Sequence, residues 1–425
     1  MDKSFQKVEK VKGVLKLPGD KSISHRSVIF SALAEGTSSI ENLSDAEDVK
    51  STISCFEQLG CSFKKSEGRL LVTGKGFKKF KEPEVLYAGN SGTTSRLLSG
   101  ILVAQQFTSV ITGDESLSSR PMKRIVDPLA EMGGLISTTP KFTLPIKISP
   151  SENLHAIEYN LPVASAQVKS AVMLAGLHLE EETTVVEFTP SRDHTEKLLS
   201  LRTEDTGTER RIFVSKKDYP WANEYFVPSD ISTAAFFIVL ALLSKESHLV
   251  IKNISLNKTR TGILEVLRAM GARIEEDNVK VTMGEQYGDL IVSYSDLHNI
   301  DIPKEIIPNV IDEIPVLSIA GLLADGNFRI SDAHELRVKE TDRISAICEN
   351  MKVLGLDVTE NEDGFEIAGR IKNQNPTFKS YGDHRIAMAF GVLSSLLDSG
   401  GKVIDFDCVG ISNPDFLNQL KSITK

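Results

Sequence analysis

The stretch LPGDKSISHR, residues 17–26, concentrates basic and hydroxyl side chains just before an apolar run. Lys21 and Arg26 can donate charge-assisted hydrogen bonds to an anion, and Ser22 and Arg26, four residues apart, share one face of a helix. A nucleotide-binding P-loop requires a lysine directly after its second glycine, whereas Asp20 separates Gly19 from Lys21 here. The cluster therefore indicates an anion site of another kind, with a capped helix carrying solvated charges as the ordinary alternative.

Four further stretches of the first half combine the same residue types. GNSGTTSR contains Asn90, Gly92 and Thr93, and its glycine allows a ligand to approach the backbone closely. In SSRPMKR, Arg120 precedes a proline and is held extended, as a clamp for a carboxylate or phosphate would require. Each stretch also has an ordinary explanation, a capped turn or a surface loop. SAQVK and SRDHTE add the remaining polar residues of this half: Ser165, Gln167, Lys169, Arg192 and His194.

The second half carries carboxylates beside its basic residues. RVKETDR, expected on a helix, would place Lys339 and Arg343 on one face with Glu340 to the side, although most such charge runs are solvated faces. Asp312, in DEIP, is the best candidate for a general base because it is expected to open a helix and nearby cations would keep it ionised. A simple N-cap is its alternative role. GDHRIAM adds His384 and Arg385 at another predicted helix start.

These stretches belong to a sixfold internal repeat, in which a polar start precedes a small-residue apolar helix, a turn and a strand. With Asp20, Asn90, Ser165, Ser229, Asp312 and Asp383 as markers, the spacings are 70, 75, 64, 83 and 71 residues. The variable period and the length of 425 residues favour two compact domains of three repeats over a solenoid. Helix N-termini attract anions, so we expect the repeated helices to point toward one shared cleft.

The amino-acid composition argues against several classes of protein. The net charge of −9 argues against a general binder of nucleic acid or membrane surfaces. Four cysteines without C-x-x-C spacing and eight histidines without a ligand pattern predict reduced thiols and no metal site. His194 and Glu196 are two apart and do not share a helix face, which disfavours a metal there. The start of the chain lacks the apolar core of a signal peptide, and the longest apolar run is ten residues, so we expect a cytoplasmic protein.

Seven motifs together, in this order, resemble the 5-enolpyruvylshikimate-3-phosphate synthase family: LPGDKSISHR, GNSGTTSR, RPM, SAQVKSA, DEIP, RVKETDR and GDHRIAM. The resemblance covers essentially the whole chain and implies an α+β fold with α/β-like repeats. That fold has two domains, each of three βαβαββ units around a pseudo-threefold axis. The implied domains are residues 20–228, and residues 1–19 together with 229–425, with crossovers near 19–21 and 227–230.

The resemblance also implies a reaction, the transfer of the enolpyruvyl group of phosphoenolpyruvate to the 5-hydroxyl of shikimate 3-phosphate with release of phosphate. No cofactor is implied, and a monomer is the default expectation. Asp312, Glu340 and Lys21 are the implied proton-transfer residues. The implied shikimate 3-phosphate ligands are Lys21, Ser22, Arg26, Ser165, Ala166, Gln167, Arg192, Asp312 and Lys339. The implied phosphoenolpyruvate ligands are Lys21, Gly92, Arg120, Gln167, Arg343 and Arg385, with Asn90, Thr93 and His384 in support.

The chain departs from some family members in two places. The region where they carry a tyrosine ligand reads SRDHTE, and Ile411 stands where they carry a lysine near the C-terminus. With GDKS, SAQVK, RDHTE and NKTR, this resembles the class II branch, whose members often tolerate the inhibitor glyphosate. Tolerance here is a hypothesis only, because Gly92 leaves room at the phosphoenolpyruvate site.

Two other functions compete with this interpretation. The sister enzyme that acts on UDP-N-acetylglucosamine carries a cysteine on the loop that here reads SLSSRPM, and it begins with a lysine–asparagine pair instead of DKS. A non-catalytic protein that binds anions or RNA ends could use related repeats, but it would not need Asp312 and Glu340 beside the basic residues.

Overall fold

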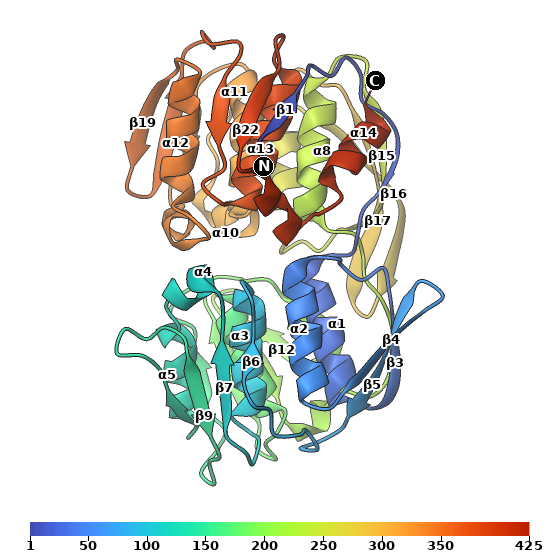
Figure 1. The fold of residues 1–425 in the computed structure, drawn as a ribbon, viewed down its shortest axis with the longest axis vertical. Coiled ribbons are helices and arrows are strands. Elements are labelled where there is room, and N and C mark those ends of the chain that lie inside the picture. Colours follow the sequence, from blue (N-terminus) through green and yellow to red (C-terminus); the bar gives the residue numbers. More distant parts are fainter. Residues whose placement is uncertain (425) are drawn as a thin grey trace. The chain divides into compact units, whose positions relative to one another are not determined.

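The computed structural model describes residues 1–424, and the chain forms two compact units. Unit 2 contains Pro18–Pro228 and Val281–Glu285; unit 1 contains Met1–Leu17, Ser229–Lys280 and the chain from Gln286 onward. In Figure 1, most of unit 2 runs from blue to green and most of unit 1 from yellow-green to red, while the dark-blue residues 1–17 also belong to unit 1. These boundaries differ from the expected ones in two places, since residues 18–19 and the short segment 281–285 belong to unit 2.

Unit 2 contains three four-stranded sheets with one shared plan. In each sheet a parallel pair is followed by two antiparallel neighbours. The first sheet has the order β14 (Glu224–Phe226), β3 (Glu35–Glu41), β5 (Arg69–Lys75), β4 (Ser62–Ser66). The second has β6 (Leu86–Tyr87), β7 (Ser109–Thr112), β9 (Ile146–Ser149), β8 (Leu135–Ser137). The third has β10 (Glu158–Asn160), β11 (Thr183–Glu187), β13 (Arg210–Val214), β12 (Thr203–Asp205).

The helices of unit 2 divide into buried and covering ones. The buried helices are α1 (Lys21–Leu33), α3 (Gly92–Leu102) and α6 (Ala166–Gly176). The others are α2 (Glu47–Gln58), α4 (Glu115–Ser119), α5 (Lys123–Glu131), α7 (His194–Leu199) and the 3₁₀ turn η1 (Lys216–Asp218). Helices α3 and α6 pack closely because their contact residues are small: a Cβ on Gly100 would lie 2.1 Å from the carbonyl oxygen of Ala171.

Unit 1 contains one four-stranded and two three-stranded sheets. Their orders are β16 (Arg273–Thr282), β17 (Glu285–Ser293), β15 (His248–Ser255), β2 (Lys12–Lys16); β18 (Phe328–Ile330), β20 (Gly364–Ala368), β19 (Asp357–Asn361); and β1 (Lys3–Phe5), β22 (Gly401–Ile404), β21 (Thr377–Lys379). The apolar helices α8 (Ile231–Leu243), α11 (Ile314–Leu323) and α13 (His384–Leu396) pack against one another and are almost wholly buried, as helices that are apolar all round must be.

The remaining helical segments of unit 1 are shorter or lie nearer the surface. They are α9 (Gly262–Ala269), α10 (Ile307–Val310), α12 (Arg343–Val353), α14 (Phe416–Ile423), η2 (Lys304–Ile306), η3 (His334–Val338) and η4 (Phe406–Ile411). In residues 1–424 no single helix has the length and apolar character to cross a membrane; only the sharply bent pair of residues 304–310 and 314–323 meets that test, by length and composition together.

Two strands are exchanged between the sequence halves. Strand β2 directly precedes α1 in the chain, yet it pairs in parallel with β15 of unit 1. Strand β14 directly precedes α8, yet it pairs in parallel with β3 of unit 2. Gly19 lies at the first of these crossovers, where a Cβ would sit 2.0 Å from the carbonyl oxygen of Asn42. This close backbone approach, and not phosphate binding, explains the glycine of the apparent P-loop.

The helix starts agree with the predicted repeat to within one residue. Asp20, Ser165 and Asp383 cap α1, α6 and α13 through their side chains, as expected. Caps one residue later than the markers are Ser91 on α3 and Asp230 on α8. The expectation that Asp312 opens α11 is wrong by one residue, because Glu313 occupies the N-cap position and its side chain makes no capping bond.

The helical assignment of RVKETDR is also wrong. Helix α12 begins only at Arg343, and Lys339 ends the preceding 3₁₀ turn in an extended conformation (φ −82°, ψ −154°). Asp342 caps α12 by accepting a hydrogen bond from the Ser345 N–H at 3.1 Å. An N-cap residue must leave helical geometry, so the aspartate inside this motif divides it into a loop and a helix start.

Candidate active site residues in the two units

In unit 2, Lys21 lies in the first turn of α1 and pairs with a carboxylate from the next helix. Its Nζ donates to Asp48 Oδ2 of α2 at 3.0 Å, and the two side chains are 23% and 11% exposed. His25, one turn further along α1, is fully buried and bonds Thr52 through Nδ1 at 2.7 Å. Burial lowers the pKa of His25 to about 3, so the ring beside Lys21 is neutral. The lysine is therefore the charged group of this turn.

Arg26 is buried and held by uncharged acceptors. Its Nε donates to Thr195 Oγ1 of α7 at 2.7 Å, one terminal nitrogen to Ser170 Oγ of α6 at 2.8 Å, and the other to the Ser22 carbonyl at 3.0 Å. No carboxylate within residues 1–424 forms an ion pair with it. Burial lowers the pKa of Arg26 to about 10, against a partial rise from Glu196. The guanidinium thus remains a buried cation with no neutralising partner of its own.

Arg120 is fixed in a similar way. It ends α4 with extended backbone, as its position before Pro121 predicts (φ −78°, ψ 140°). One terminal nitrogen donates to Asn90 Oδ1 at 2.7 Å and to Ser116 Oγ at 3.2 Å. Asn90 is itself held, because its amide nitrogen donates to Asp114 Oδ2 at 2.7 Å. The buried Nε of Arg120 has no hydrogen-bond partner in the described chain.

Gln167, at the start of α6, contacts the start of α3. Its amide nitrogen donates to Thr93 Oγ1 at 3.0 Å, and its amide oxygen accepts from Arg96. Gly92 lies between the arginines of this region, since a Cβ there would stand 3.2 Å from an Arg96 nitrogen and 3.6 Å from an Arg120 nitrogen. The first turns of two repeats are therefore joined by side-chain contacts.

The other expected residues of unit 2 have less defined contacts. Ser165 caps α6, and Ala166 is the first residue of that helix. Ser22 contributes its carbonyl to Arg26. Arg192 lies half-buried just before α7, and its positive charge lowers the pKa of Arg26 by repulsion.

In unit 1, Arg343 lies at the centre of a carboxylate cluster. Its side chain is 1% exposed, with Nε 2.8 Å from Asp383 Oδ2, one terminal nitrogen 2.6 Å from Glu340 Oε2 and the other 3.4 Å from Asp312 Oδ1. Burial opposes the charge, but the three carboxylates outweigh it, first Asp383, then Glu340 and Asp312, and raise the pKa of Arg343. The guanidinium is therefore permanently charged.

Asp312 contacts every basic residue expected in unit 1. Lys339 Nζ lies 3.9 Å from Oδ1, and an Arg385 nitrogen lies 3.8 Å from Oδ2. Arg385 also donates to the Asp312 carbonyl at 2.8 Å and lies 3.5 Å from the buried Glu313. His384, the first residue of α13, is 2% exposed. The predicted residues of unit 1 thus form one contiguous group.

The two groups differ in charge. In unit 1 the cations of Lys339, Arg343 and Arg385 face the carboxylates of Asp312, Glu340 and Asp383, and Glu313 lies near Arg385 as a fourth, so that group has no cationic surplus. In unit 2, Lys21 pairs with Asp48, whereas Arg26 and Arg120 have only neutral partners. The cationic surplus that an anionic ligand requires therefore comes from unit 2.

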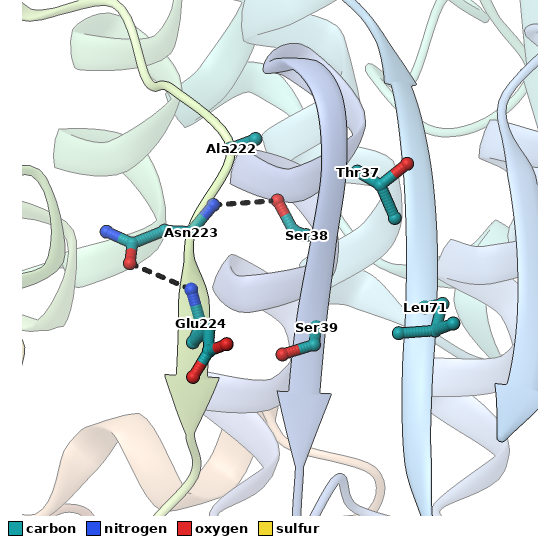
Figure 2. A pocket seen from close by; sticks show the side chains of 7 residues that line it. All are labelled: Thr37, Ser38, Ser39, Leu71, Ala222, Asn223 and Glu224. Carbon is teal, nitrogen blue, oxygen red and sulfur yellow. Dashed lines mark hydrogen bonds between the residues drawn. The ribbon is translucent and has the colours of Figure 1, made fainter.

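A surface hollow of about 280 Å³ in unit 2 lies apart from these residues. Figure 2 shows it between β3 and the segment leading into β14, where the Asn223 N–H donates to Ser38 Oγ at 3.1 Å. Its lining lacks basic side chains and consists of Thr37, Ser38, Ser39, Leu71, Ala222, Asn223 and Glu224. It offers nothing that would bind a phosphate. No group of three potential metal ligands occurs among residues 1–424.

Sequence reasoning missed several residues that fix the expected ones. Asp48 holds Lys21, Asp114 holds Asn90, and Glu313 lies against Arg385. Thr195 and Ser170 hold Arg26. A signal existed for Glu313, in the DEIP motif, and for Asp114, which opens a short helix. Asp48 lies in DAEDVK, an ordinary pattern for a helix start, and nothing in the sequence indicated that it would bind Lys21.

Comparisons with known proteins identify the family. A family model described as EPSP synthase (3-phosphoshikimate 1-carboxyvinyltransferase) matches residues 5–420. Relatives named 3-phosphoshikimate 1-carboxyvinyltransferase include one from Petrotoga mobilis, 47% identical with 98% of both chains covered, and one from Salinibacter ruber, 45% identical over the whole of both.

Solved structures show the same relationship. The EPSP synthase from Acinetobacter baumannii has a TM-score of 0.87 at 40% identity and covers 100% of this chain and 98% of its own. The enolpyruvyl transferase NikO from Streptomyces tendae has a TM-score of 0.76 at 15% identity, which shows a shared fold. The expected two-domain enolpyruvyl transferase fold is confirmed. The chain belongs to the EPSP synthase family of 3-phosphoshikimate 1-carboxyvinyltransferases.

Proposed function

We propose that the chain binds phosphoenolpyruvate and shikimate 3-phosphate and transfers the enolpyruvyl group from the first to the second. This is the reaction that the names of the relatives state, and family membership over the full length supports it. The UDP-N-acetylglucosamine alternative is not favoured by the family that matches.

One observation carries the assignment of the anion-binding residues. Arg26 and Arg120 are both held in place by neutral oxygens, and the buried Nε–H of Arg120 has no partner in the described chain. Arg26 is buried and Arg120 is partly buried, and removing a guanidinium from water without a carboxylate partner is costly, so such sites are expected where an anion completes the charge. Two of them in one unit suit two anionic substrates.

The proposed assignments follow the family motifs. Shikimate 3-phosphate contacts Lys21, Ser22, Arg26, Ser165, Ala166, Gln167, Arg192, Asp312 and Lys339. Phosphoenolpyruvate contacts Lys21, Gly92, Arg120, Gln167, Arg343 and Arg385, with Asn90, Thr93 and His384 in support. The hydrogen bonds of Asn90 to Arg120 and of Thr93 to Gln167 favour these supporting roles.

The chemistry is addition followed by elimination. The 5-hydroxyl oxygen attacks C2 of phosphoenolpyruvate, a base accepts the hydroxyl proton, and an acid protonates the methylene carbon to give a tetrahedral adduct. Loss of a methyl proton and of phosphate then restores the double bond. Asp312 and Glu340, both beside Arg343, are the candidates for these proton transfers, with Lys21 assisting.

The cations have a second task in this scheme. Negative charge gathers on the phosphate as it leaves, and donors already fixed in position stabilise it without reorganisation. Arg343 is held by three carboxylates and Arg120 by Asn90 and Ser116, so both guanidinium groups are preorganised.

A phosphate-release assay tests the proposal. Phosphoenolpyruvate is supplied with shikimate 3-phosphate in one arm and with UDP-N-acetylglucosamine in the other. Release only in the first arm supports the proposal, release only in the second assigns the sister activity, and release in neither indicates a non-catalytic protein. Lys21→Met and Arg120→Ala should lower turnover by at least about a hundredfold, while Lys50→Met, at an exposed pair with Glu47, should not.

The chain is further proposed to act as a monomer in the cytoplasm. Its similarity to the 3-phosphoshikimate 1-carboxyvinyltransferases supports the location, and the ordinary proportion of charged and hydrophobic residues in the sequence supports the monomer. Light scattering during gel filtration, at the concentration of the assay, would contradict the monomer by giving twice the mass of 46.6 kDa.

A further inference from the structure

A buried lysine next to the Arg26 site takes no part in the proposed reaction. Lys169 on α6 has a side chain that is 0% exposed, and it forms ion pairs with Glu187 of β11 at 2.9 Å and with Glu196 of α7 at 2.7 Å. The two glutamates are 1% and 2% exposed. These groups are among the most deeply buried charges in unit 2.

The cluster of Lys169, Glu187 and Glu196 is linked to Arg26 through two neighbouring residues of the chain. Lys169 is followed on α6 by Ser170, and Glu196 follows Thr195 on α7; Ser170 and Thr195 are the two hydroxyl partners of Arg26. The two hydroxyls also bond each other at 2.7 Å. Glu196 acts on the charge of Arg26 more strongly than any other carboxylate does, yet it forms no ion pair with it.

We infer that Lys169 keeps the carboxylate of Glu196 away from Arg26 and so preserves the charge of that arginine for the substrate. Lys169 gives Glu196 an ion-pair partner within its own cluster, although neither carboxylate oxygen accepts a hydrogen bond in the described chain, and Arg26 donates instead to the hydroxyls of Ser170 and Thr195. Without Lys169, the buried Glu196 loses its ion-pair partner, and Arg26, which donates to the neighbouring Thr195, is the cation that its charge already acts on. An internal carboxylate on Arg26 would compete with an anionic ligand there.

This makes Lys169 a positioning residue for recognition of shikimate 3-phosphate, and the inference rests on the proposed function of Arg26. It predicts an effect on one substrate only. Lys169→Met should raise the KM for shikimate 3-phosphate by at least about tenfold, which corresponds to about 1.4 kcal/mol. The KM for phosphoenolpyruvate should change by less than about twofold, because Arg120 shares no contact with this cluster.

A second substitution distinguishes this role from a purely structural one. In Lys169→Met/Glu196→Gln the competing carboxylate is gone, so the KM for shikimate 3-phosphate should return to within about threefold of the wild type. If Lys169 only supported packing, removing a second charged partner would not restore binding. A double variant as impaired as Lys169→Met would overturn the inference.

A third variant covers the case in which Lys169→Met does not fold. Glu196→Gln leaves Lys169 paired with Glu187, so it should bind shikimate 3-phosphate as tightly as the wild type or more tightly. A rise in KM of about tenfold in Glu196→Gln would contradict the inference, because it would show that the carboxylate assists binding. Wild-type protein without phosphate release from either substrate pair would instead refute the proposed function.

Discussion

The carboxylate cluster around Arg343 allows a quantitative prediction for stability. Arg343→Met removes the only cation of residues 1–424 that forms an ion pair with Asp383 and leaves that carboxylate, which is 0% exposed, inside unit 1. Removing one partner of a buried ion pair typically costs about 3–5 kcal/mol. Asp383 keeps hydrogen bonds from the N–H groups of Arg385 and Ile386 at the start of α13. We therefore expect the lower end, a loss of about 3 kcal/mol in the free energy of unfolding.

The other two partners of Arg343 add little to this figure. Glu340 is 23% exposed and can be hydrated when its partner is lost. Asp312 is 13% exposed and keeps Lys339 and Arg385 near its two oxygens. Arg343→Lys should recover only part of the loss, because an ammonium group cannot contact three carboxylates with the geometry of a guanidinium.

Hydrogen exchange in increasing urea, followed on peptides of α12 and α13, is the suitable assay. The single Trp221 belongs to unit 2, so its fluorescence would report on the wrong unit. Lys402→Met is the matched control in unit 1, since its pair with Asp2 at 2.7 Å is 43% and 41% exposed and solvent should screen it almost completely. Equal losses in Arg343→Met and Lys402→Met would refute the reasoning.

Three further predictions concern unit 2. Burial lowers the pKa of His25 to about 3 and that of His178 to about 4, so between those values and about pH 6.5 the unfolded chain binds more protons than the folded one. Unit 2 should therefore lose stability on acidification, by up to about 2.7 kcal/mol per pH unit near pH 5, and His178→Asn should halve this slope when urea unfolding is followed by Trp221 fluorescence. In Gly92→Ala, the new methyl group would lie 3.2 Å from a nitrogen of Arg96 and 3.6 Å from a nitrogen of Arg120. The KM for phosphoenolpyruvate should therefore rise about tenfold, and inhibition by glyphosate should weaken. An unchanged KM would show that Gly92 does not belong to the site. In Asp114→Ser, the serine oxygen can still cap α4 but is too short to accept the hydrogen bond from Asn90, which holds Arg120. The KM for phosphoenolpyruvate should therefore rise several-fold. A change only in the KM for shikimate 3-phosphate would contradict the proposed series of hydrogen bonds from Asp114 through Asn90 to Arg120.

The linear sequence determined the repeated elements and the residue types that could bind anions. Helix starts were readable because capping depends on one side chain and the next few backbone N–H groups, which are local in sequence. Asp20, Ser165 and Asp383 were therefore identified correctly, and the other caps lay one residue away. The seven motifs led to the correct family for the same reason, since each is a short local pattern.

Local patterns could not reveal which side chain meets which across the fold. The motif RVKETDR was expected on one helix, but Asp342 caps α12 and leaves Lys339 and Glu340 on the preceding loop. Lys339 and Arg343 still meet, through the distant Asp312 and not through helical spacing. The exchange of β2 and β14 and the transfer of Val281–Glu285 to unit 2 depend likewise on long-range strand pairing and packing.

The tertiary structure alone decided which partners surround the charge of each arginine. Arg26, Arg120 and Arg343 are the same type of residue. In the fold, however, Arg26 and Arg120 have neutral partners, whereas Arg343 contacts three carboxylates. Those partners lie 30 to 169 residues away for most contacts, and burial makes each interaction far stronger than it would be in water. The electrostatic difference between the two units is therefore a property of packing, because Coulomb interactions in a protein depend on distance and burial and not on separation along the chain.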